Sequence, residues 1–173
     1  MNRVCLLAIC LWTVPVFAAE WQSKKAPLMT KWAADVSPDN VHPEYPRPQL
    51  VRQNWLNLNG LWEYSIQSKD AAQPTVWEAD KILVPFPVES ALSGVMKLVG
   101  LDHKLWYRRT FTISIKDGKA DEAWDGKTIL LHFEAVDWQT TVWINGREVG
   151  SHTGQSHLNL RHFSKGGCRI KGG

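Results

Sequence analysis

The sequence predicts an all-β protein folded as an antiparallel β-sandwich, and three observations lead to that prediction. Apolar and polar residues alternate along several short segments, turn-forming residues separate those segments, and no convincing helical period follows the first twenty residues. Period-two alternation is typical of a strand with one buried face. Short strands at regular spacing favour a sandwich or a jelly roll, and 173 residues are enough for about one such domain.

The composition excludes several other classes of protein. Twenty Lys and Arg residues against 17 Asp and Glu give a net charge of +3, an excess too small and too scattered to indicate a nucleic-acid partner. A hydrophobic fraction of 44% with 21% charged residues is ordinary for a globular chain and excludes disorder, a coiled coil and a polytopic membrane protein. Ten tryptophans are the unusual feature, and they bear on the candidate sites below.

Residues 1–18 are expected to form a signal peptide. A single positive charge at Arg3 precedes an apolar run over residues 4–17, and small residues follow at Ala18 and Ala19, a pattern typical of a cleavable secretory signal. The alternative is an uncleaved anchor, although the run is shorter than the roughly 20 residues that span a bilayer. We therefore expect a secreted or periplasmic protein that has no membrane contact after cleavage. Two of the three cysteines lie in this segment, so the mature chain keeps Cys168 alone and forms no internal disulfide.

Residues 19–50 are expected to form an extended leader. They contain five prolines, which break helices, together with polar residues and tryptophan. We expect this leader to lie along the surface of the domain that follows it.

The strands are expected over residues 61–66, 106–116, 127–135 and 140–144. In the second and third of these segments, apolar residues occupy every other position, which predicts half-buried antiparallel strands. The segment between them, residues 117–126, is expected to be a solvated loop. Asn145 and Gly146 separate two strand-like runs, and this pair is the strongest short signal for a hairpin with a type I′ turn.

Five blocks of sequence carry a resemblance to a known family. They are NLNGLW at residues 57–62, ILVPFPVES at 82–90, LWYRRTF at 105–111, LHFEAVD at 131–137 and VWINGREVGSH at 142–152. In this order and near this spacing, they resemble the N-terminal sugar-binding domain of glycoside hydrolase family 2, the family of β-galactosidases, β-glucuronidases and β-mannosidases. The resemblance covers about residues 46–154.

The resemblance implies a galactose-binding-like jelly roll over residues 51–154. It also implies two partners in a complete enzyme, an immunoglobulin-like domain and a (β/α)₈ barrel, which follow this domain in the family. The barrel carries the two glutamates of retaining hydrolysis. No residue of this chain matches either glutamate, so we assign no catalytic residue and no cofactor, and we expect no hydrolysis by this chain alone. Its role would be to shape the rim of the active site and to support the barrel.

The sequence departs from the family after Gly154. Where the family continues with a second glycine, an aromatic residue and a further strand, this chain reads QSHLNLRHF at residues 155–163 and then becomes rich in glycine. We therefore interpret residues 155–173 as a divergent, truncated tail, in which the closing strands of the jelly roll are missing or replaced.

Three residues are candidates for contact with a sugar. In the family, the region after the Val-Pro pair lies close to the active site, so the resemblance makes Glu89 and Ser90 candidates for hydrogen bonds at the rim. The alternative is a turn stabilised by Ser90 and the neighbouring prolines. Trp138 stands between two expected strands and could offer its ring as a platform for a sugar. The tryptophans at 62, 106 and 143 lie within strand patterns, where core packing is the expected role.

Other charged residues carry weaker chemical signals. Arg108 and Arg109 could clamp an acidic sugar, or they could form an ion pair within the sheet or with a neighbouring domain. Glu134 and Asp137 stand three apart, so a strand would point them to opposite faces and they would not converge as an acid and base. Three histidines recur every five residues after residue 151, a spacing that does not suit a metal, and we predict no metal site.

Three functional hypotheses remain open at this point. The first is the N-terminal module of a secreted family 2 glycosidase, which acts in carbohydrate metabolism as part of the complete enzyme. The second is a free-standing carbohydrate-binding module. The third is an inert fragment, because a jelly roll without its closing strands would expose unpaired strand edges.

Overall fold

The structure is a computed structural model that describes residues 21–112, 115–116, 119–120, 129–134, 136, 138–154, 158–161 and 167–172. The expected signal peptide therefore lies outside the described residues, as does most of the expected loop at 117–126. Among the described residues, helical structure is confined to short 3₁₀ turns, and no helix combines the length and apolar character needed to cross a membrane.

The strands confirm the all-β prediction. They are β1 (Gly60–Ser68), β2 (Lys81–Val84), β3 (His103–Thr112), β4 (Ile115–Lys116), β5 (Lys119–Ala120), β6 (Leu130–Phe133), β7 (Gln139–Ile144), β8 (Arg147–Thr153), β9 (Leu158–Arg161) and β10 (Gly167–Gly172). The 3₁₀ turns are η1 (Lys31–Asp35), η2 (Pro48–Leu50) and η3 (Ala91–Ser93).

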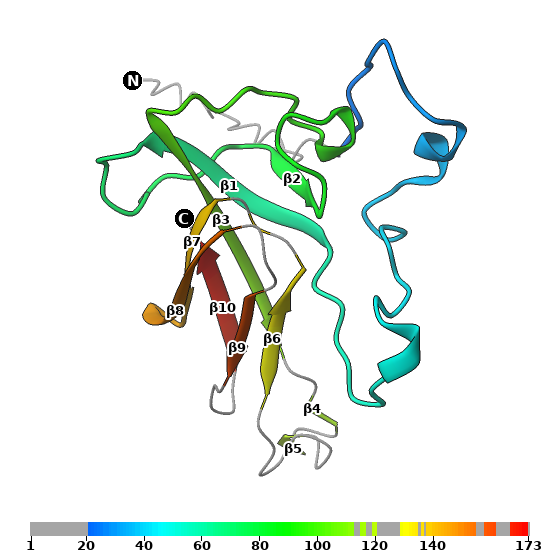
Figure 1. Cartoon of the computed structure of the whole chain (residues 1–173), viewed down its shortest axis with the longest axis vertical. Coiled ribbons are helices and arrows are strands. Elements are labelled where there is room, and N and C mark those ends of the chain that lie inside the picture. Colours follow the sequence, from blue (N-terminus) through cyan, green and yellow to red (C-terminus); the bar gives the residue numbers. More distant parts are fainter. Residues whose placement is uncertain are drawn as a thin grey trace, which may run out of the picture.

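One large sheet organises the molecule (Figure 1). It has six strands in the order β2-β1-β3-β10-β7-β8, and every neighbouring pair is antiparallel. Two smaller antiparallel pairs, β4-β5 and β6-β9, complete the described strands. Because Leu131 of β6 joins the same buried cluster as residues of β1, β2 and β7, elements of two sheets enclose one core, as the predicted β-sandwich requires.

Strand alternation decides which face of the large sheet is the core. Trp62 and Tyr64 of β1 are buried there with Ile82 of β2, whereas Glu63 between them points to the opposite face. The buried members of this cluster are Trp62, Tyr64, Ile82, Val88, Val95, Leu131, Val142 and Ile144. Burial of these apolar side chains is the main driving force that holds the strands together.

The turn between β7 and β8 confirms the predicted hairpin. Asn145 has φ 52° and Gly146 has φ 83°, so both central residues adopt the left-handed conformation that a type I′ turn requires. Ile144 and Arg147 pair on either side of the turn. The two turn residues thus set the pairing next to the turn, and the register then shifts between Val142 and Trp143.

The segment after Gly154 contributes strands to both sheets. β9 pairs with β6, and β10 lies between β3 and β7 in the large sheet (Figure 1). The pairing of β10 with β3 and β7 therefore continues the large sheet beyond residue 154, as far as Gly172.

Candidate functional site

The segment that follows β2 carries two of the three predicted sugar-contact residues, and it is held by an internal hydrogen-bond network. Ser93 is fully buried at its centre. The Ser93 hydroxyl lies 3.1 Å from the Val88 carbonyl and 2.8 Å from the Ser90 carbonyl, and it accepts the backbone N–H groups of Val95 and Met96. One small side chain therefore fixes the path of the backbone over eight or more residues.

Ser90 caps the 3₁₀ turn η3. Its Oγ accepts the backbone N–H of Ser93 at 3.2 Å, as N-cap residues commonly do. This hydrogen bond is the one expected if Ser90 stabilises the turn, the alternative role given to it above. A hydrogen bond from Ser90 to a sugar stays a prediction.

Glu89 is exposed next to this cap. Burial of Tyr107, with a smaller contribution from the negative charge of Glu89, raises the pKa of the Tyr107 phenol well above its usual range. The Tyr107 ring packs edge-on against Trp62, with ring centroids 6.5 Å apart. Glu89 is thus an exposed carboxylate on a braced segment that packs over the core.

The leader contacts the same segment. Trp21 Nε1 donates to the Ser93 carbonyl at 3.1 Å, and the Lys24 backbone N–H donates to Ala91 O at 2.9 Å. Gly94 adopts φ 81°, and a Cβ at this position would overlap the Trp21 indole. Only glycine meets both requirements without strain, so the leader and the segment after β2 fit together at Gly94.

Trp138, the third predicted sugar contact, lies elsewhere. Its side chain is 64% exposed, and its carbonyl accepts the Gly154 N–H at 2.7 Å. β1, β3 and β10 separate β2 from β7, and the register places Trp138 at the opposite end of the sheet from Val84, where the segment carrying Glu89 begins. The structure therefore keeps Glu89 and Ser90 together and does not bring Trp138 to them.

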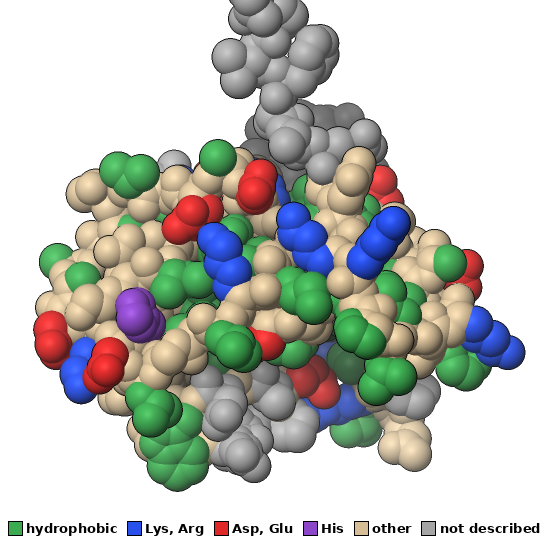
Figure 2. All heavy atoms as spheres, turned by 90° about the horizontal axis from the view of Figure 1, so that it is seen from above, with side chains coloured by type: hydrophobic (Ala, Val, Ile, Leu, Met, Phe, Trp, Pro, Cys, Tyr) green, Lys and Arg blue, Asp and Glu red, His purple; other side chains and the backbone are tan. Residues whose placement is uncertain are grey.

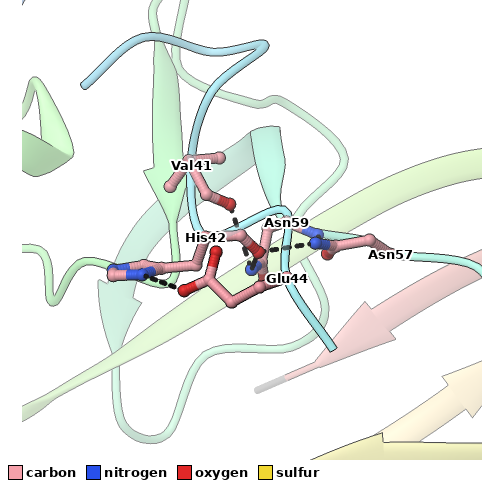
Figure 3. A network of polar contacts seen from close by, with 5 residues as sticks. All are labelled: Val41, His42, Glu44, Asn57 and Asn59. Atoms are coloured by element: carbon pink, nitrogen blue, oxygen red, sulfur yellow. Dashed lines mark hydrogen bonds and ion pairs between the residues drawn. The ribbon is translucent and has the colours of Figure 1, made fainter. Parts of the chain in front are cut away.

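Two asparagines before β1 anchor the middle of the leader (Figure 3). Asn57 Nδ2 donates to the His42 carbonyl at 2.8 Å, and Asn59 Nδ2 lies 3.3 Å from the carbonyls of both Val41 and His42. Val41 is buried, while the His42 ring pairs with exposed Glu44 at 3.5 Å. Sequence reasoning noted the NLNGLW block without finding this role, although paired amides directly before a strand were the signal for it.

Arg109 of β3 adds further contacts to this region, and we call Asn57, Asn59 and Arg109 together the junction. Its Nη1 donates to the carbonyls of Leu58 and Asn59, both at 2.8 Å, and its guanidinium lies 6.0 Å from the Trp62 ring centroid. Burial lowers the pKa of Arg109 from its ordinary value. The structure thus turns Arg109 toward backbone carbonyls of its own chain.

Arg108 forms the ion pair within the sheet that was one of its two expected roles. Its Nε donates to Glu63 on the neighbouring strand β1, and Lys81 Nζ of β2 lies 3.2 Å from the other carboxylate oxygen. The Arg108 guanidinium also lies 4.2 Å from the centroid of the Trp77 ring. Glu63 therefore joins three strands through its two oxygens.

We expect the contribution of Glu63 to stability to depend on pH. The Arg108 hydrogen bond, followed by Lys81, holds the pKa of Glu63 below its ordinary value, despite opposing desolvation. A lowered pKa in the folded state stabilises the fold above the ordinary carboxyl pKa of about 4.5, and this stabilisation is lost as pH falls through the lowered value. Urea unfolding of wild type and Glu63→Gln should therefore show a wild-type advantage at neutral pH that shrinks in acid.

Glu148→Gln is the matched control for this prediction. Glu148 is an exposed carboxylate on β8, so its replacement should change the unfolding free energy by no more than about 0.5 kcal/mol. A difference between wild type and Glu63→Gln that stays constant from neutral pH into acid would contradict the role given to the ion pairs.

The remaining candidates from the sequence form no further centre in the described part of the chain. Among all the residues that the structure describes, no three His, Cys, Asp or Glu side chains lie close enough together to bind a metal ion. Asp137 and two of the three regularly spaced histidines lie outside the described residues, and Glu134 is exposed.

Comparison with known proteins shows what this chain is similar to. No family model matches the sequence. A β-glucuronidase of Paenibacillus borealis is 25% identical over 115 residues, which cover 64% of this chain and 18% of that enzyme. A β-galactosidase of Thermoanaerobacter pseudethanolicus is 41% identical over 49 residues, covering 28% of this chain and 6% of that enzyme. Among solved structures, a β-glucuronidase of Faecalibacterium prausnitzii superposes with a TM-score of 0.49 at 18% identity, over 68% of this chain and 20% of that chain.

The domain is therefore an all-β segment related to glycosidases. Its homologues, named β-glucuronidase and β-galactosidase, confirm the predicted resemblance to glycoside hydrolase family 2. The chain spans less than a fifth of the length of either curated relative.

Proposed function

We propose that this chain is the N-terminal sugar-binding and structural module of a secreted family 2 glycoside hydrolase. The observation that carries the proposal is the 115-residue match to the P. borealis β-glucuronidase, which covers 64% of this chain and only 18% of that enzyme. A segment of that size corresponds to about one domain. Hydrolysis of O-glycosyl bonds would then belong to the complete enzyme, with the catalytic carboxylates in its barrel.

The braced segment after β2 suits a role at the rim of an active site. Ser93, inside the segment, and Trp21, from the leader, hold its backbone on two sides. Exposed Glu89 is thereby presented from a fixed support, and a fixed support is what positions a polar group accurately against a ligand. Glu89 would form the hydrogen bond to the sugar, while Ser90 holds the turn.

The exposed apolar residues suit contacts with the rest of such an enzyme. Leu28, Leu98 and Leu101 are each more than 90% exposed. Figure 2 shows one end of the molecule, where hydrophobic side chains lie among basic and acidic ones. Exposed apolar side chains are removed from water when another domain covers them, which is favourable. The downstream immunoglobulin-like and barrel domains are the partners that the proposal assigns to these leucines.

Exchange of the domain tests this proposal directly. We expect the chain alone to hydrolyse no aryl β-glucuronide, β-galactoside or β-mannoside. We expect a chimera, in which this chain replaces the aligned segment of the P. borealis β-glucuronidase, to hydrolyse an aryl β-glucuronide faster than the same enzyme with that segment deleted. The deletion variant is the control, and Glu89→Gln in the chimera tests the rim contact through KM.

Two results would contradict the proposal. One is turnover by the chain alone. The other is a chimera that is folded, as judged by circular dichroism, and yet no more active than the deletion variant.

A free-standing carbohydrate-binding module is the second candidate, and the exposed ring of Trp138 favours it. If the chain is such a module, neutral methyl β-glycosides would change the tryptophan fluorescence of the wild type saturably. The same sugars would leave the fluorescence of the Trp138→Ala variant unchanged. The chimera would then gain no activity from this chain, which separates the two candidates.

A further inference from the structure

The face of the large sheet opposite the core carries an unusual set of side chains. Glu63 pairs with Arg108, and Ser65 pairs with Trp106. Side chains alternate along a strand, so these four residues lie on the face of the sheet opposite to Trp62 and Tyr64. We call five of its residues the tryptophan face: Trp77, Lys104, Trp106, Arg108 and Trp143. They come from β3, β7 and the segment before β2.

The aromatic part of the tryptophan face is a stacked pair. Trp106 and Trp143 lie with ring centroids 5.4 Å apart and planes at 30°. Trp106 is 5% exposed at the base, while Trp143 is half-buried and more open. Within the described part of the chain, buried Trp106 Nε1 has no hydrogen-bond partner. An unpaired buried donor is destabilising, but this nitrogen has almost no exposed surface, so a ligand on this face would contact the more open ring of Trp143.

The charged part of the tryptophan face is mainly cationic. Lys104 Nζ lies 5.4 Å from the Trp106 ring centroid, and Arg108 stacks on Trp77 while only its Nε is used by Glu63 in the hydrogen bonds described. Lys81 of β2 pairs with Glu63 both in register and as an ion pair. Three cations, Lys81, Lys104 and Arg108, therefore stand against two carboxylates, Glu63 and, at the far end of the row, Glu148.

We propose that the tryptophan face binds an acidic carbohydrate, with a uronic acid residue as the recognised unit. A sugar ring presents apolar C–H groups to an aromatic face, which Trp143 supplies, and its carboxylate suits pairing with Lys104 or Arg108. A neutral sugar would leave the cations without a new partner. This site is separate from the segment that carries Glu89, and its ligand binding does not depend on hydrolysis by a larger enzyme.

A titration with matched ligands tests the proposal. Trigalacturonate is added to the full chain while heat and tryptophan fluorescence are followed, and its fully methyl-esterified form serves as the neutral partner of the same skeleton. We expect saturable binding of the acid, binding of the ester about tenfold weaker or less, and loss of affinity as salt is raised. Equal binding of acid and ester would overturn the proposal. So would tighter binding of a single-stranded trinucleotide, which also combines negative charge with rings that stack on tryptophan.

Matched variants place the ligand on the tryptophan face. Lys104→Gln should weaken binding of trigalacturonate about fivefold, and Trp143→Ala about tenfold. The controls are Lys31→Gln and Trp32→Ala, which change another lysine-on-tryptophan pair, 4.9 Å apart in the leader. Both controls should bind as the wild type does. The circular dichroism couplet of the stacked Trp106–Trp143 pair should disappear in Trp143→Ala alone.

The outcome stays decisive if Trp143→Ala fails to fold. Lys104→Gln removes one charge from a half-buried position and keeps most of the length of the side chain. If Lys104→Gln binds no differently from Lys31→Gln, the proposal is wrong, whatever the chimera with the P. borealis enzyme shows. A failed chimera with normal trigalacturonate binding would refute the proposed function alone.

Discussion

Replacing Trp62 by alanine is expected to destabilise the domain by about 3–5 kcal/mol, since a buried tryptophan truncated to alanine loses its transfer energy and leaves a cavity. Trp62 is 6% exposed in the central cluster, and its ring packs edge-on against Tyr107. Its Nε1 also donates to the Leu58 carbonyl at 2.8 Å. Urea unfolding followed by far-ultraviolet circular dichroism would measure the loss.

Trp32→Ala is the matched control for this prediction. Trp32 is 65% exposed in η1 of the leader, so its removal should change the unfolding free energy by no more than about 0.5 kcal/mol. Similar losses for the two variants would contradict the central position of Trp62 in the core.

Replacing Arg109 by methionine is expected to cost about 2–3 kcal/mol. Methionine keeps much of the apolar stem and removes both charge-assisted hydrogen bonds to the Leu58 and Asn59 carbonyls, each 2.8 Å long. The same urea titration measures the loss. The control Arg147→Met changes an exposed arginine on β8 and should fall within about 0.5 kcal/mol of the wild type.

The two variants should also be coupled. Trp62 Nε1 and Arg109 Nη1 donate to the same Leu58 carbonyl. Residues that share a partner usually give non-additive losses, so the double variant should lose less than the sum of the single losses. Strict additivity would argue against a shared acceptor at Leu58.

Local pattern was enough to predict most of the large sheet. The alternation over residues 61–66 and 106–116 corresponds to β1 and β3, although β3 begins earlier, at His103, and ends at Thr112. The predicted strand at 127–135 contains β6, and the one at 140–144 matches β7 closely. In β7 the buried residues Thr140, Val142 and Ile144 stand at every other position, which is the condition under which period two is visible in a sequence.

The position of the tail strand could not be predicted in this way. β10 is rich in glycine, with GCRIKG over its six residues, and glycine is depleted in strands. Its partners are β3, more than fifty residues earlier in the chain, and β7. Pairing over such a distance is set by tertiary structure, so no local pattern announces it.

The candidate site shows the same division between local and distant information. The turn at Ser90 was open to prediction because a cap and its N–H partner stand three residues apart. The junction formed by Arg109, Asn57 and Asn59 was not, because Arg109 reaches carbonyls about fifty residues earlier. The leader contact at Gly94 likewise joins residues about seventy positions apart, at Trp21 and Ser93.

The place of β10 in the sheet has a consequence for biosynthesis. It is the last strand along the described chain, yet it joins the β2-β1-β3 group to the β7-β8 hairpin. A ribosome that had released only residues up to Thr153 would have produced two separate half-sheets with open edges. Nascent chains of this protein should therefore need shielding from one another until β10 has paired with β3 and β7, because unpaired strand edges are templates for aggregation.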